Sequence, residues 1–217
     1  MGFTIIAPVG DNTQALFVGM KQFPTERVIL LAPKSNSKLA QGLAEQLKTF
    51  TIKTDIIDIE NNIMEEMFRV FGQLCSIYPP DDLIVNVATG DRMSTCAALS
   101  AAFANGLKAF GVVGDQCMLM PIMKLSYYNE LSDNKMKILK KLSAQNYVTL
   151  KELNKKVGMS VSLLSYHLNG NYNYKGLKEF RLVELKEHNK NLLVKLSSLG
   201  HLLLKGYIKT KKEAEQK

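Results

Sequence analysis

A polar turn between an apolar stretch and a small-residue stretch holds the residues best suited to bind an anion. Residues 83–88 are apolar or small around one asparagine, which predicts a buried parallel strand. Thr89, Gly90 and Asp91 follow and are typical of a turn and a helix N-cap. Backbone N–H groups and the helix dipole favour an anion such as phosphate at a helix N-terminus. The turn is therefore the candidate ligand site.

Two residues beside the turn decide how it is interpreted. In a purely structural alternative, Thr89 and Asp91 only cap a buried helix. Arg92 weakens that alternative, because a cation in the first helical turn opposes the helix dipole unless an anion is bound. A second alternative is that the Asp91 carboxylate pairs with Arg92 and neutralises the site. The amide of Asn86 is either a satisfied core group or a group that points into the cleft, and the sequence leaves both open.

Strands and helices alternate through the first part of the chain. Strands are expected at residues 3–9, 27–32, 54–59 and 83–88, and helices at 15–19, 35–50, 61–77 and 92–105. Two further strands, 108–114 and 116–125, are expected to form a hairpin. This order predicts the α/β class with a Rossmann-like, mostly parallel sheet and helices on both faces.

Ligands bind such sheets beyond the carboxyl ends of the strands, at the point where the strand order reverses. This rule adds the turn at residues 10–13 to the turn at 88–94. Neither turn contains the G-x-G-x-x-G pattern or a P-loop, so an ordinary dinucleotide or nucleoside triphosphate site is not expected.

The second part of the chain has a helix-turn-helix pattern. A helix capped by Ser132 or Asp133 precedes helices at 150–157 and 161–168, which are separated by a three-residue turn containing Gly158. Strands at 182–186 and 192–196 around a polar tip predict a β-wing, and a short helix closes the segment. On the second helix of the pair, the residues expected to be buried are Val161, Leu164 and Leu168.

Charge divides the chain in the same way as the pattern of elements. Residues 1–131 carry a net charge of −3 and residues 132–217 carry +11, within a total of +8. A basic segment attracts a polyphosphate chain such as DNA. No apolar run approaches the roughly 20 residues that a membrane span needs. The N-terminus has no basic region or cleavage site, which predicts a cytoplasmic protein.

The cysteines and histidines have no spacing typical of a metal site. Cys75, Cys96 and Cys117 are widely separated and lie in apolar surroundings, so they are expected to be buried and reduced. The three histidines share no ligand spacing with each other or with a cysteine. Neither a metal nor a cofactor is expected.

Residues 86–94, Asn-Val-Ala-Thr-Gly-Asp-Arg-Met-Ser, and the small residues 97–102 resemble the NxTGGTK-M motif and following helix of CARF domains, the CRISPR-associated Rossmann folds. The resemblance covers about residues 1–125. It implies a homodimer that binds cyclic oligoadenylate, or another nucleotide effector, with two turns of each sheet. Here Asp91 replaces a glycine of the family and Arg92 replaces a lysine. Carried over by position, the ligand contacts are Gly10, Asp11, Asn12, Thr13, Ala88, Thr89, Gly90, Arg92 and Met93.

Residues 132–208 resemble winged helix-turn-helix domains of the MarR/ArsR type. The resemblance rests on residues 164–168, on Gly176-Leu177 before Leu182-Val183, and on residues 194–200. In such domains the second helix of the pair enters the major groove of double-stranded DNA and the wing reaches an adjacent groove. A helix pair used only for dimerisation or protein contact remains the alternative. The expected DNA contacts are Ser160, Ser162, Leu163, Ser165, Tyr166, Lys186, His188 and Lys190.

The two resemblances together predict a protein similar to archaeal CRISPR-linked transcriptional regulators. The expected domains are a ligand-sensing and dimerisation domain at 1–125, a linker at 126–131, a DNA-binding domain at 132–208 and a basic tail at 209–217. The expected function is a ligand-responsive, non-enzymatic regulator. The alternative is a ring nuclease that cleaves cyclic oligoadenylate with Thr13 and Arg92, which residues 1–131 would do without any histidine. A third possibility is that the first domain serves only as a dimerisation platform.

Overall fold

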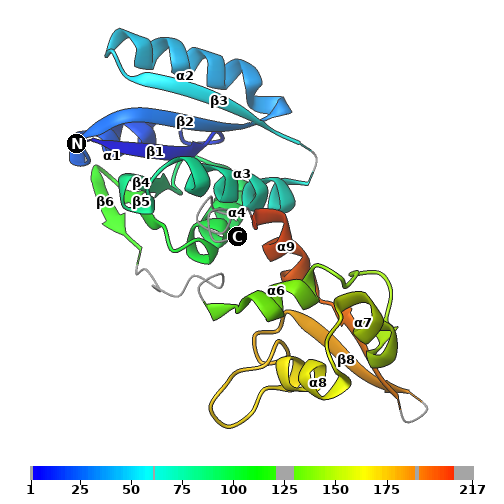
Figure 1. The fold of residues 1–217 in the computed structure, drawn as a ribbon. Helices are drawn as coiled ribbons and strands as arrows, with labels where there is room; N and C mark the ends of the chain where they lie inside the picture. Colours follow the sequence, from blue (N-terminus) through cyan, green and yellow to red (C-terminus); the bar gives the residue numbers. More distant parts are fainter. Residues whose placement is uncertain (1, 61, 121–129, 189–190, 208–217) are drawn as a thin grey trace. The chain divides into compact units, whose positions relative to one another are not determined.

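A computed structural model of the chain describes residues 2–60, 62–120, 130–188 and 191–207. These residues fall into two compact units, one within Met1–Tyr128 together with Gly206 and Tyr207, and the other within Asn129–Lys205 (Figure 1). None of the described helices is both long enough and apolar enough to cross a lipid bilayer. Four expectations lie wholly or partly outside the described residues: strand residues 121–125, linker residues 126–129, the wing-tip contact Lys190 and the tail 209–217.

The first unit contains a six-stranded sheet with the order β3-β2-β1-β4-β5-β6. Strands β1 to β5 run parallel, and β6 pairs with β5 in the antiparallel direction, as the expected hairpin requires. The predicted α/β class and mostly parallel sheet are therefore confirmed. The strand bounds are β1 (Phe3–Pro8), β2 (Thr25–Pro33), β3 (Lys53–Ile59), β4 (Leu83–Asn86), β5 (Lys108–Val113) and β6 (Gln116–Leu119).

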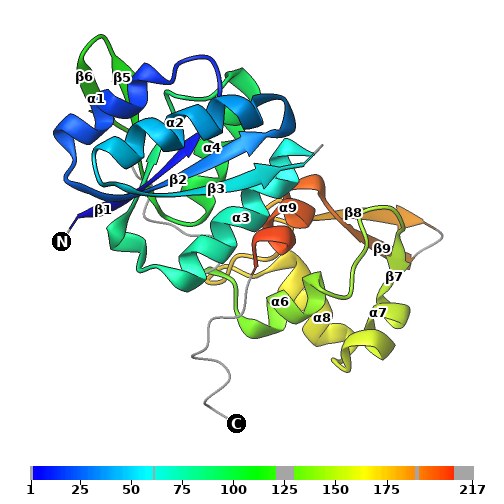
Figure 2. The same cartoon turned by 90° about the horizontal axis from the view of Figure 1, so that it is seen from above.

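Four α-helices cover the two faces of this sheet. Helices α3 and α4 pack side by side on one face, and α2 lies on the other (Figures 1 and 2). Helix α1 shares a core cluster with α2, which places both on the same face. The strand order reverses between β1 and β4, so the helices that follow these two strands lie on opposite faces. The helix bounds are α1 (Gln14–Gln22), α2 (Ser37–Thr49), α3 (Ile63–Ile77) and α4 (Arg92–Ala104), with short 3-10 turns η1 (Lys34–Asn36) and η2 (Pro80–Asp82).

The central strands are buried along nearly their whole length because helices cover both of their faces. All four residues of β4 are buried, and so are the last five of β1. On α2 the i, i+4 spacing of Leu39, Leu43 and Leu47 is typical of an amphipathic helix, but Leu39 is exposed and Ala40 is fully buried. The i, i+3, i+7 spacing of Ala40, Leu43 and Leu47 forms the true stripe, and Leu39 falls beside it.

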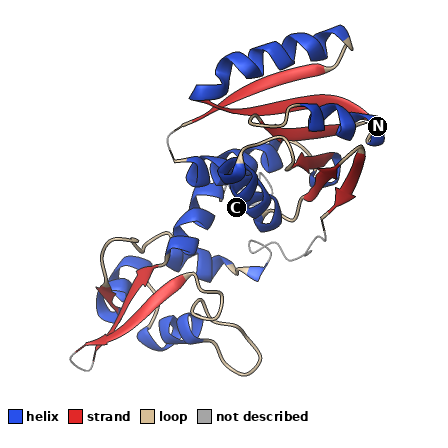
Figure 3. Ribbon diagram, turned by 180° about the vertical axis from the view of Figure 1, so that it is seen from behind, coloured by secondary structure: helices blue, strands red, loops and turns tan. Residues whose placement is uncertain are grey.

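The second unit combines helices with a three-stranded antiparallel sheet of order β7-β9-β8 (Figure 3). The two-residue strand β7 was not predicted, because two residues show no periodicity. In chain order the elements are α6 (Asp133–Leu139), β7 (Val148–Thr149), α7 (Leu150–Val157), α8 (Val161–Asn169), β8 (Val183–His188), β9 (Asn191–Leu196) and α9 (Ser198–Gly206).

Local side-chain bonds fix the turn between α7 and α8. Thr149 and Glu152 form a reciprocal capping box at the start of α7. Helix α7 ends at Gly158, which has φ 71°, a conformation that glycine adopts without a steric cost. The Ser160 hydroxyl then accepts a hydrogen bond of 3.2 Å from the Leu163 N–H and starts α8. The predicted separation of the two helices by three residues is therefore correct.

Candidate functional site

The two turns predicted to form the ligand site lie against each other at the carboxyl edge of the sheet. The Asn12 backbone N–H donates a hydrogen bond of 3.3 Å to the Thr89 carbonyl. Gly10 packs so closely against the second turn that an added Cβ would lie 2.2 Å from the Asp91 nitrogen and 2.6 Å from the Gly90 carbonyl carbon. Only glycine fits at position 10 in this arrangement. The order of the strands and this close approach bring the turns together at the point where the strand order reverses.

Asp91 is the N-cap of α4. Its carboxylate oxygen Oδ1 accepts a hydrogen bond of 2.7 Å from the Ser94 N–H. Arg92 is exposed and forms no ion pair within the part of the chain that the structure describes. The carboxylate is therefore engaged by the helix backbone, and the Arg92 guanidinium remains available to an anion. Thr89 does not cap α4: it is buried, and its hydroxyl donates to the Asn86 carbonyl at 3.4 Å.

Asn86 is a satisfied core residue. Its side chain is fully buried, and Nδ2 donates to the Ala15 carbonyl at 2.9 Å. Its oxygen Oδ1 accepts a hydrogen bond of 3.0 Å from the Ala88 N–H. This result selects the first of the two alternatives that the sequence left open. The Asn86 amide therefore joins the first turn of α1 to the turn after β4 and helps to fix the position of both.

The nine predicted ligand contacts differ in how they can meet a ligand. Gly10 and Thr89 are buried and shape the turns rather than offering side chains to solvent. The side chains that a ligand can reach come from both turns and carry one anion, one amide, one cation and one thioether. The exposed residues are Asp11, Asn12, Arg92 and Met93, and the half-buried ones are Thr13, Ala88 and Gly90.

The sequence did not single out two residues, Asn36 and Thr95, that hold these turns in place. Asn36, just after β2, donates from Nδ2 to the Val9 carbonyl at 2.8 Å, so a third turn supports the first one. The Thr95 hydroxyl donates to the Val87 carbonyl at 3.0 Å. The Ser94 hydroxyl is buried and has no hydrogen-bond partner among the described residues. Asn36 follows the carboxyl end of a strand, so the rule that placed the two turns also pointed to it.

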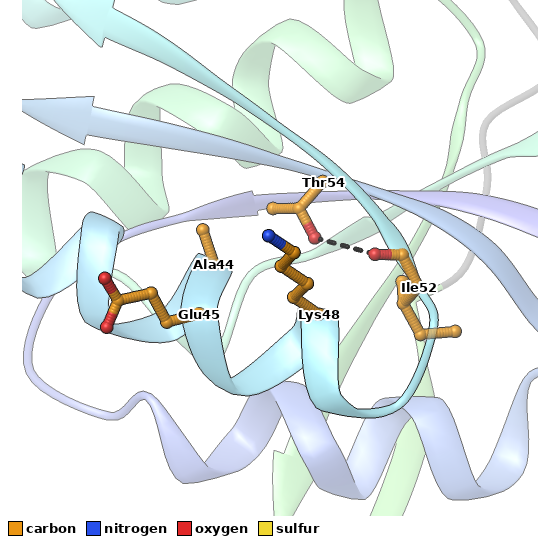
Figure 4. Close-up of a pocket in the computed structure, with 5 residues that line it drawn as sticks. All are labelled: Ala44, Glu45, Lys48, Ile52 and Thr54. Carbon is orange, nitrogen blue, oxygen red and sulfur yellow. Dashed lines mark hydrogen bonds between the residues drawn. The ribbon is translucent and has the colours of Figure 1, made fainter.

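A separate cavity of about 300 Å³ lies between the second half of α2 and the start of β3 (Figure 4). It is lined by Ala44, Glu45, Lys48, Ile52 and Thr54. In the close-up Glu45 points away from Thr54 and Lys48 extends toward it. The cavity is at the amino end of β3, so it lies at the opposite end of the parallel strands from the two turns and is not part of the candidate site.

In the second unit, α8 presents a polar face to solvent. Ser160, Ser162, Leu163 and Tyr166 are exposed and Ser165 is half-buried. Lys186 and His188 are also exposed, on β8. The predicted contacts that the structure describes therefore lie on the outside of this unit, where a nucleic acid can reach them.

One residue of the predicted buried face of α8 is misplaced. Leu164 and Leu168 are fully buried, but Val161 is 43% exposed. Val161 is the first residue of α8. Periodicity shows which side of a helix is apolar, but it does not show whether the packed neighbour reaches the end of that helix. His167 contributes to the buried face instead, with 8% of its surface exposed. Burial, with a smaller contribution from Lys135, lowers the pKa of this histidine.

The prediction that all three cysteines are buried is wrong. Cys96 is exposed, and Cys75 and Cys117 are half-buried. On α4 the buried side is the stripe that contains Ala97, Ala98, Ala101 and Ala102, and Cys96 lies off this stripe. Burial raises the pKa of the Cys75 thiol to about 11, which keeps that thiol protonated at neutral pH. No group of residues suited to hold a metal ion occurs in the described ranges.

Comparison with known proteins finds similar solved structures but no similar sequence family. No family model matches the sequence, and no curated protein matches it. Can2 from Sulfobacillus thermosulfidooxidans, in complex with cyclic tetra-adenylate, is 16% identical with a TM-score of 0.46 over 94% of this chain and 61% of that one. Protein VC1899 from Vibrio cholerae is 13% identical with a TM-score of 0.48 over 94% and 64% of the two chains.

A type III CRISPR defence DNA nuclease activated by cyclic oligoadenylate is 13% identical, with a TM-score of 0.43 over 86% of this chain and 36% of that one. This chain therefore spans less than two thirds of each of the three solved proteins. Likenesses at these scores do not assign the chain to a family.

Proposed function

We propose that this protein is a ligand-responsive DNA-binding regulator that senses cyclic oligoadenylate, or a related nucleotide, in CRISPR-linked defence. The nucleotide binds the two turns of the first unit, and the second unit binds double-stranded DNA. The protein acts as a homodimer with a domain boundary at residues 126–131. The two neighbouring proteins that bind or respond to cyclic oligoadenylate are consistent with this effector, but the proposal rests on the residues of this chain.

The contact between the two turns carries the proposal. Gly10 against the Gly90–Asp91 peptide, and Asn12 bonded to Thr89, form one continuous edge from two separate strand ends. The first turn of α4 and the guanidinium of Arg92 meet at this edge, and no described residue forms an ion pair with that guanidinium. Backbone N–H groups and an arginine that can bind two phosphate oxygens at once form a phosphate-binding arrangement. Exposed Asn12 and Met93 beside them can contact the bases.

The second unit has the charge and surface for DNA. Residues 129–205 contain 14 lysines and arginines against 6 aspartates and glutamates. The exposed face of α8 carries hydroxyl groups that hydrogen-bond to phosphates or base edges. None of its predicted contacts is an arginine, so we expect a large electrostatic share in the affinity and modest base discrimination.

Direct binding of cyclic tetra-adenylate tests the first half of the proposal. Isothermal titration calorimetry is expected to show saturable binding by the wild-type protein, weakened about tenfold or more by Arg92→Ala because a charge-assisted contact to phosphate is lost. Lys53→Ala is the matched control, since Lys53 is an exposed cation at the amino end of β3. Equal affinity of the wild type and Arg92→Ala would contradict the assignment of this site.

Incubation with labelled cyclic tetra-adenylate separates the sensor from the alternative enzyme. The residues available near the turns for ring cleavage are Thr13 and Arg92, and arginine does not transfer protons at neutral pH. We therefore expect the ring to remain intact after prolonged incubation. Accumulation of linear product that depends on Thr13 would assign ring nuclease activity instead.

Duplex DNA binding tests the second half. Fluorescence anisotropy is expected to show binding that weakens steeply as salt rises, because each phosphate contact releases counterions. A Lys186→Ala variant should weaken binding to all duplex sequences and reduce the salt slope by about one. Absence of salt-dependent duplex binding would refute the regulatory role.

A further inference from the structure

A compact turn after α8 presents tyrosine side chains to solvent. An isolated bridge pairs Gly170 with Lys175, and between them the backbones of Asn171 and Tyr174 exchange hydrogen bonds of 2.9 and 3.3 Å. At the tip of this turn Tyr172 is fully exposed. A single exposed apolar side chain is common on a protein surface, but several exposed aromatic rings close together are typical of an interaction site.

The turn is held in one conformation by several bonds. The Asn171 side-chain oxygen accepts hydrogen bonds from the backbone N–H groups of Asn173 and Tyr174, at 3.0 and 2.9 Å. The ammonium group of Lys135, on α6, donates to the Lys175 carbonyl at 2.5 Å. Gly170 has φ 75°, which glycine adopts readily. The tyrosines are therefore presented by a preorganised turn, so binding through them costs little conformational entropy.

The aromatic surface is continuous with the exposed face of α8. The rings of Tyr174 and Tyr166 lie with their centroids 6.4 Å apart. Tyr174 is 63% exposed, and the Asn173 amide beside it also faces solvent. We call Tyr166, Tyr172 and Tyr174 the tyrosine surface. In the sequence, Tyr172 and Tyr174 follow the predicted DNA-binding helix and precede the two strands of the wing.

Basic residues follow directly on the tyrosine surface. Lys175, Lys178 and Arg181 are exposed. The one acidic residue among them, Glu179, accepts a hydrogen bond from the Gly176 N–H at 3.2 Å. Exposed aromatic rings beside cations are the arrangement that binds unpaired nucleic-acid bases, because each base offers a flat face for stacking while the cations meet the phosphates.

We infer that the tyrosine surface is a stacking site for unpaired DNA bases that flank the duplex bound by α8. In intact duplex the base faces are covered by their neighbours, so an exposed ring can stack only on an unpaired base or a strand end. Tyr172 and Tyr174 stack on successive bases, and Lys175 and Lys178 contact the phosphates between them. The inference rests on the proposal that this unit binds DNA, and it adds a preference for duplex with a single-stranded flank.

Two labelled probes test the inference on the full-length protein by fluorescence anisotropy. One is a blunt duplex of about two helical turns, and the other is the same duplex with a tail of about six thymidines. The wild type is expected to bind the tailed probe about tenfold more tightly, because stacking on one base by one aromatic side chain is worth roughly that factor. Tyrosine emission should fall on binding the tail, and it is not masked by tryptophan, which the chain lacks.

Variants of the tip residue locate the effect. Tyr172→Ala is expected to reduce the preference for the tailed probe to what stacking on Tyr174 alone contributes, while its affinity for the blunt probe stays unchanged. Its salt slope on either probe should equal that of the wild type, since no cation is removed. Tyr172→Phe should keep the preference, because stacking needs the ring and not the hydroxyl. Because Tyr172 is fully exposed, neither variant should change the thermal unfolding midpoint of the protein.

Tyr147→Ala is the matched control for the loss of an exposed tyrosine. Tyr147 is 38% exposed, but its hydroxyl donates to Glu184 at 3.2 Å and the Lys195 ammonium lies 5.1 Å from its ring centre. This variant should keep the preference for the tail. Equal affinity of the wild type for both probes would overturn the inference and leave the proposed function intact. Failure to bind either probe would overturn both.

Discussion

At the scale of single residues, Gly10 is the residue of the two turns that tolerates substitution least. The space for a side chain at Gly10 is already filled by the Gly90–Asp91 peptide. Gly10→Ala must push the turns apart, so we expect a loss of about 1–3 kcal/mol of unfolding free energy and weaker binding of cyclic tetra-adenylate. Thermal unfolding and calorimetry measure the two effects.

Gly42→Ala is the control for Gly10→Ala. Gly42 lies inside α2, and an added Cβ there meets nothing within 4 Å. Alanine favours a helix interior over glycine by roughly 0.5–1 kcal/mol, so this variant should be slightly more stable than the wild type. If Gly10→Ala matched it in stability and in ligand affinity, the close contact between the turns would have no functional importance.

Asp91 tests whether the carboxylate at the head of α4 opposes the ligand. Its bond to the Ser94 N–H stabilises the helix, but its charge lies where a phosphate is proposed to bind. Asp91→Gly removes the charge and costs only a few tenths of a kcal/mol as an N-cap. Ligand affinity, measured by calorimetry, should therefore rise. Asp91→Asn also removes the charge and preserves the N-cap, so it should bind the ligand at least as tightly as Asp91→Gly does. Weaker binding by both variants would contradict this view.

The buried amide of Asn86 gives a prediction for the framework under the site. Asn86→Asp has nearly the same shape, but an ionised carboxylate cannot donate to the Ala15 carbonyl. The unsatisfied carbonyl and the buried charge should lower the unfolding free energy by about 1–3 kcal/mol or more. The loss should shrink at acidic pH, where a protonated carboxyl can donate again. A urea titration at two pH values measures this, and equal losses at both would contradict the observed bond.

At the scale of elements, α8 holds a buried histidine that is expected to make the second unit less stable in acid. Neither ring nitrogen of His167 has a hydrogen-bond partner among the described residues. Burial, and then the neighbouring charge of Lys135, lower the pKa of His167, so the folded state favours the neutral ring. The unfolded chain binds the proton more readily, and this contribution to stability is present above the ordinary value of about 6.5 and is lost as pH falls below it.

Urea unfolding at neutral pH and at about pH 5.5 measures the contribution of His167. The wild type should be less stable at the lower pH, and His167→Leu, which cannot titrate, should lose less stability between the two. His188→Gln is the control, because His188 is exposed on β8 and its replacement should leave the wild-type difference in place. A pH dependence that is identical in wild type and His167→Leu would exclude the histidine as its source.

The elements also show which features the sequence could predict. Strongly periodic or fully apolar segments, such as β1, β4 and α3, were placed correctly because burial on a sheet face leaves a clear pattern. The predicted burial of individual residues was wrong where it depends on the packed neighbours as well as on the apolar pattern of the element. Leu39 falls beside the buried stripe of α2, and Val161 is the first residue of α8. Cys96 lies on the outer side of a helix whose small residues make both sides look alike.

At the scale of the whole molecule, the order of strands and helices predicted where the candidate site lies, but it did not predict the hydrogen bonds that support it. The carboxyl-edge rule placed both turns, because strand order and connection handedness follow from the alternation of strands and helices. The N-cap role of Asp91 was one of the alternatives. The support from Asn36, which lies 27 residues from its partner Val9, and the inward direction of Asn86 depend on tertiary packing. A single sequence does not encode such pairings in a local pattern.

The proposed nucleotide site and the proposed DNA-binding unit lie in one chain, and this predicts a measurable coupling between the two ligands. Saturating cyclic tetra-adenylate should change duplex affinity by about 5- to 150-fold, which corresponds to a coupling free energy of about 1–3 kcal/mol. Linkage requires that duplex DNA change the affinity for the nucleotide by the same factor and in the same direction, so anisotropy and calorimetry must agree. Arg92→Ala should bind duplex normally but lose the response to the nucleotide. If the wild type binds both and neither affects the other, the first unit does not regulate DNA binding, and the proposed regulatory function is wrong.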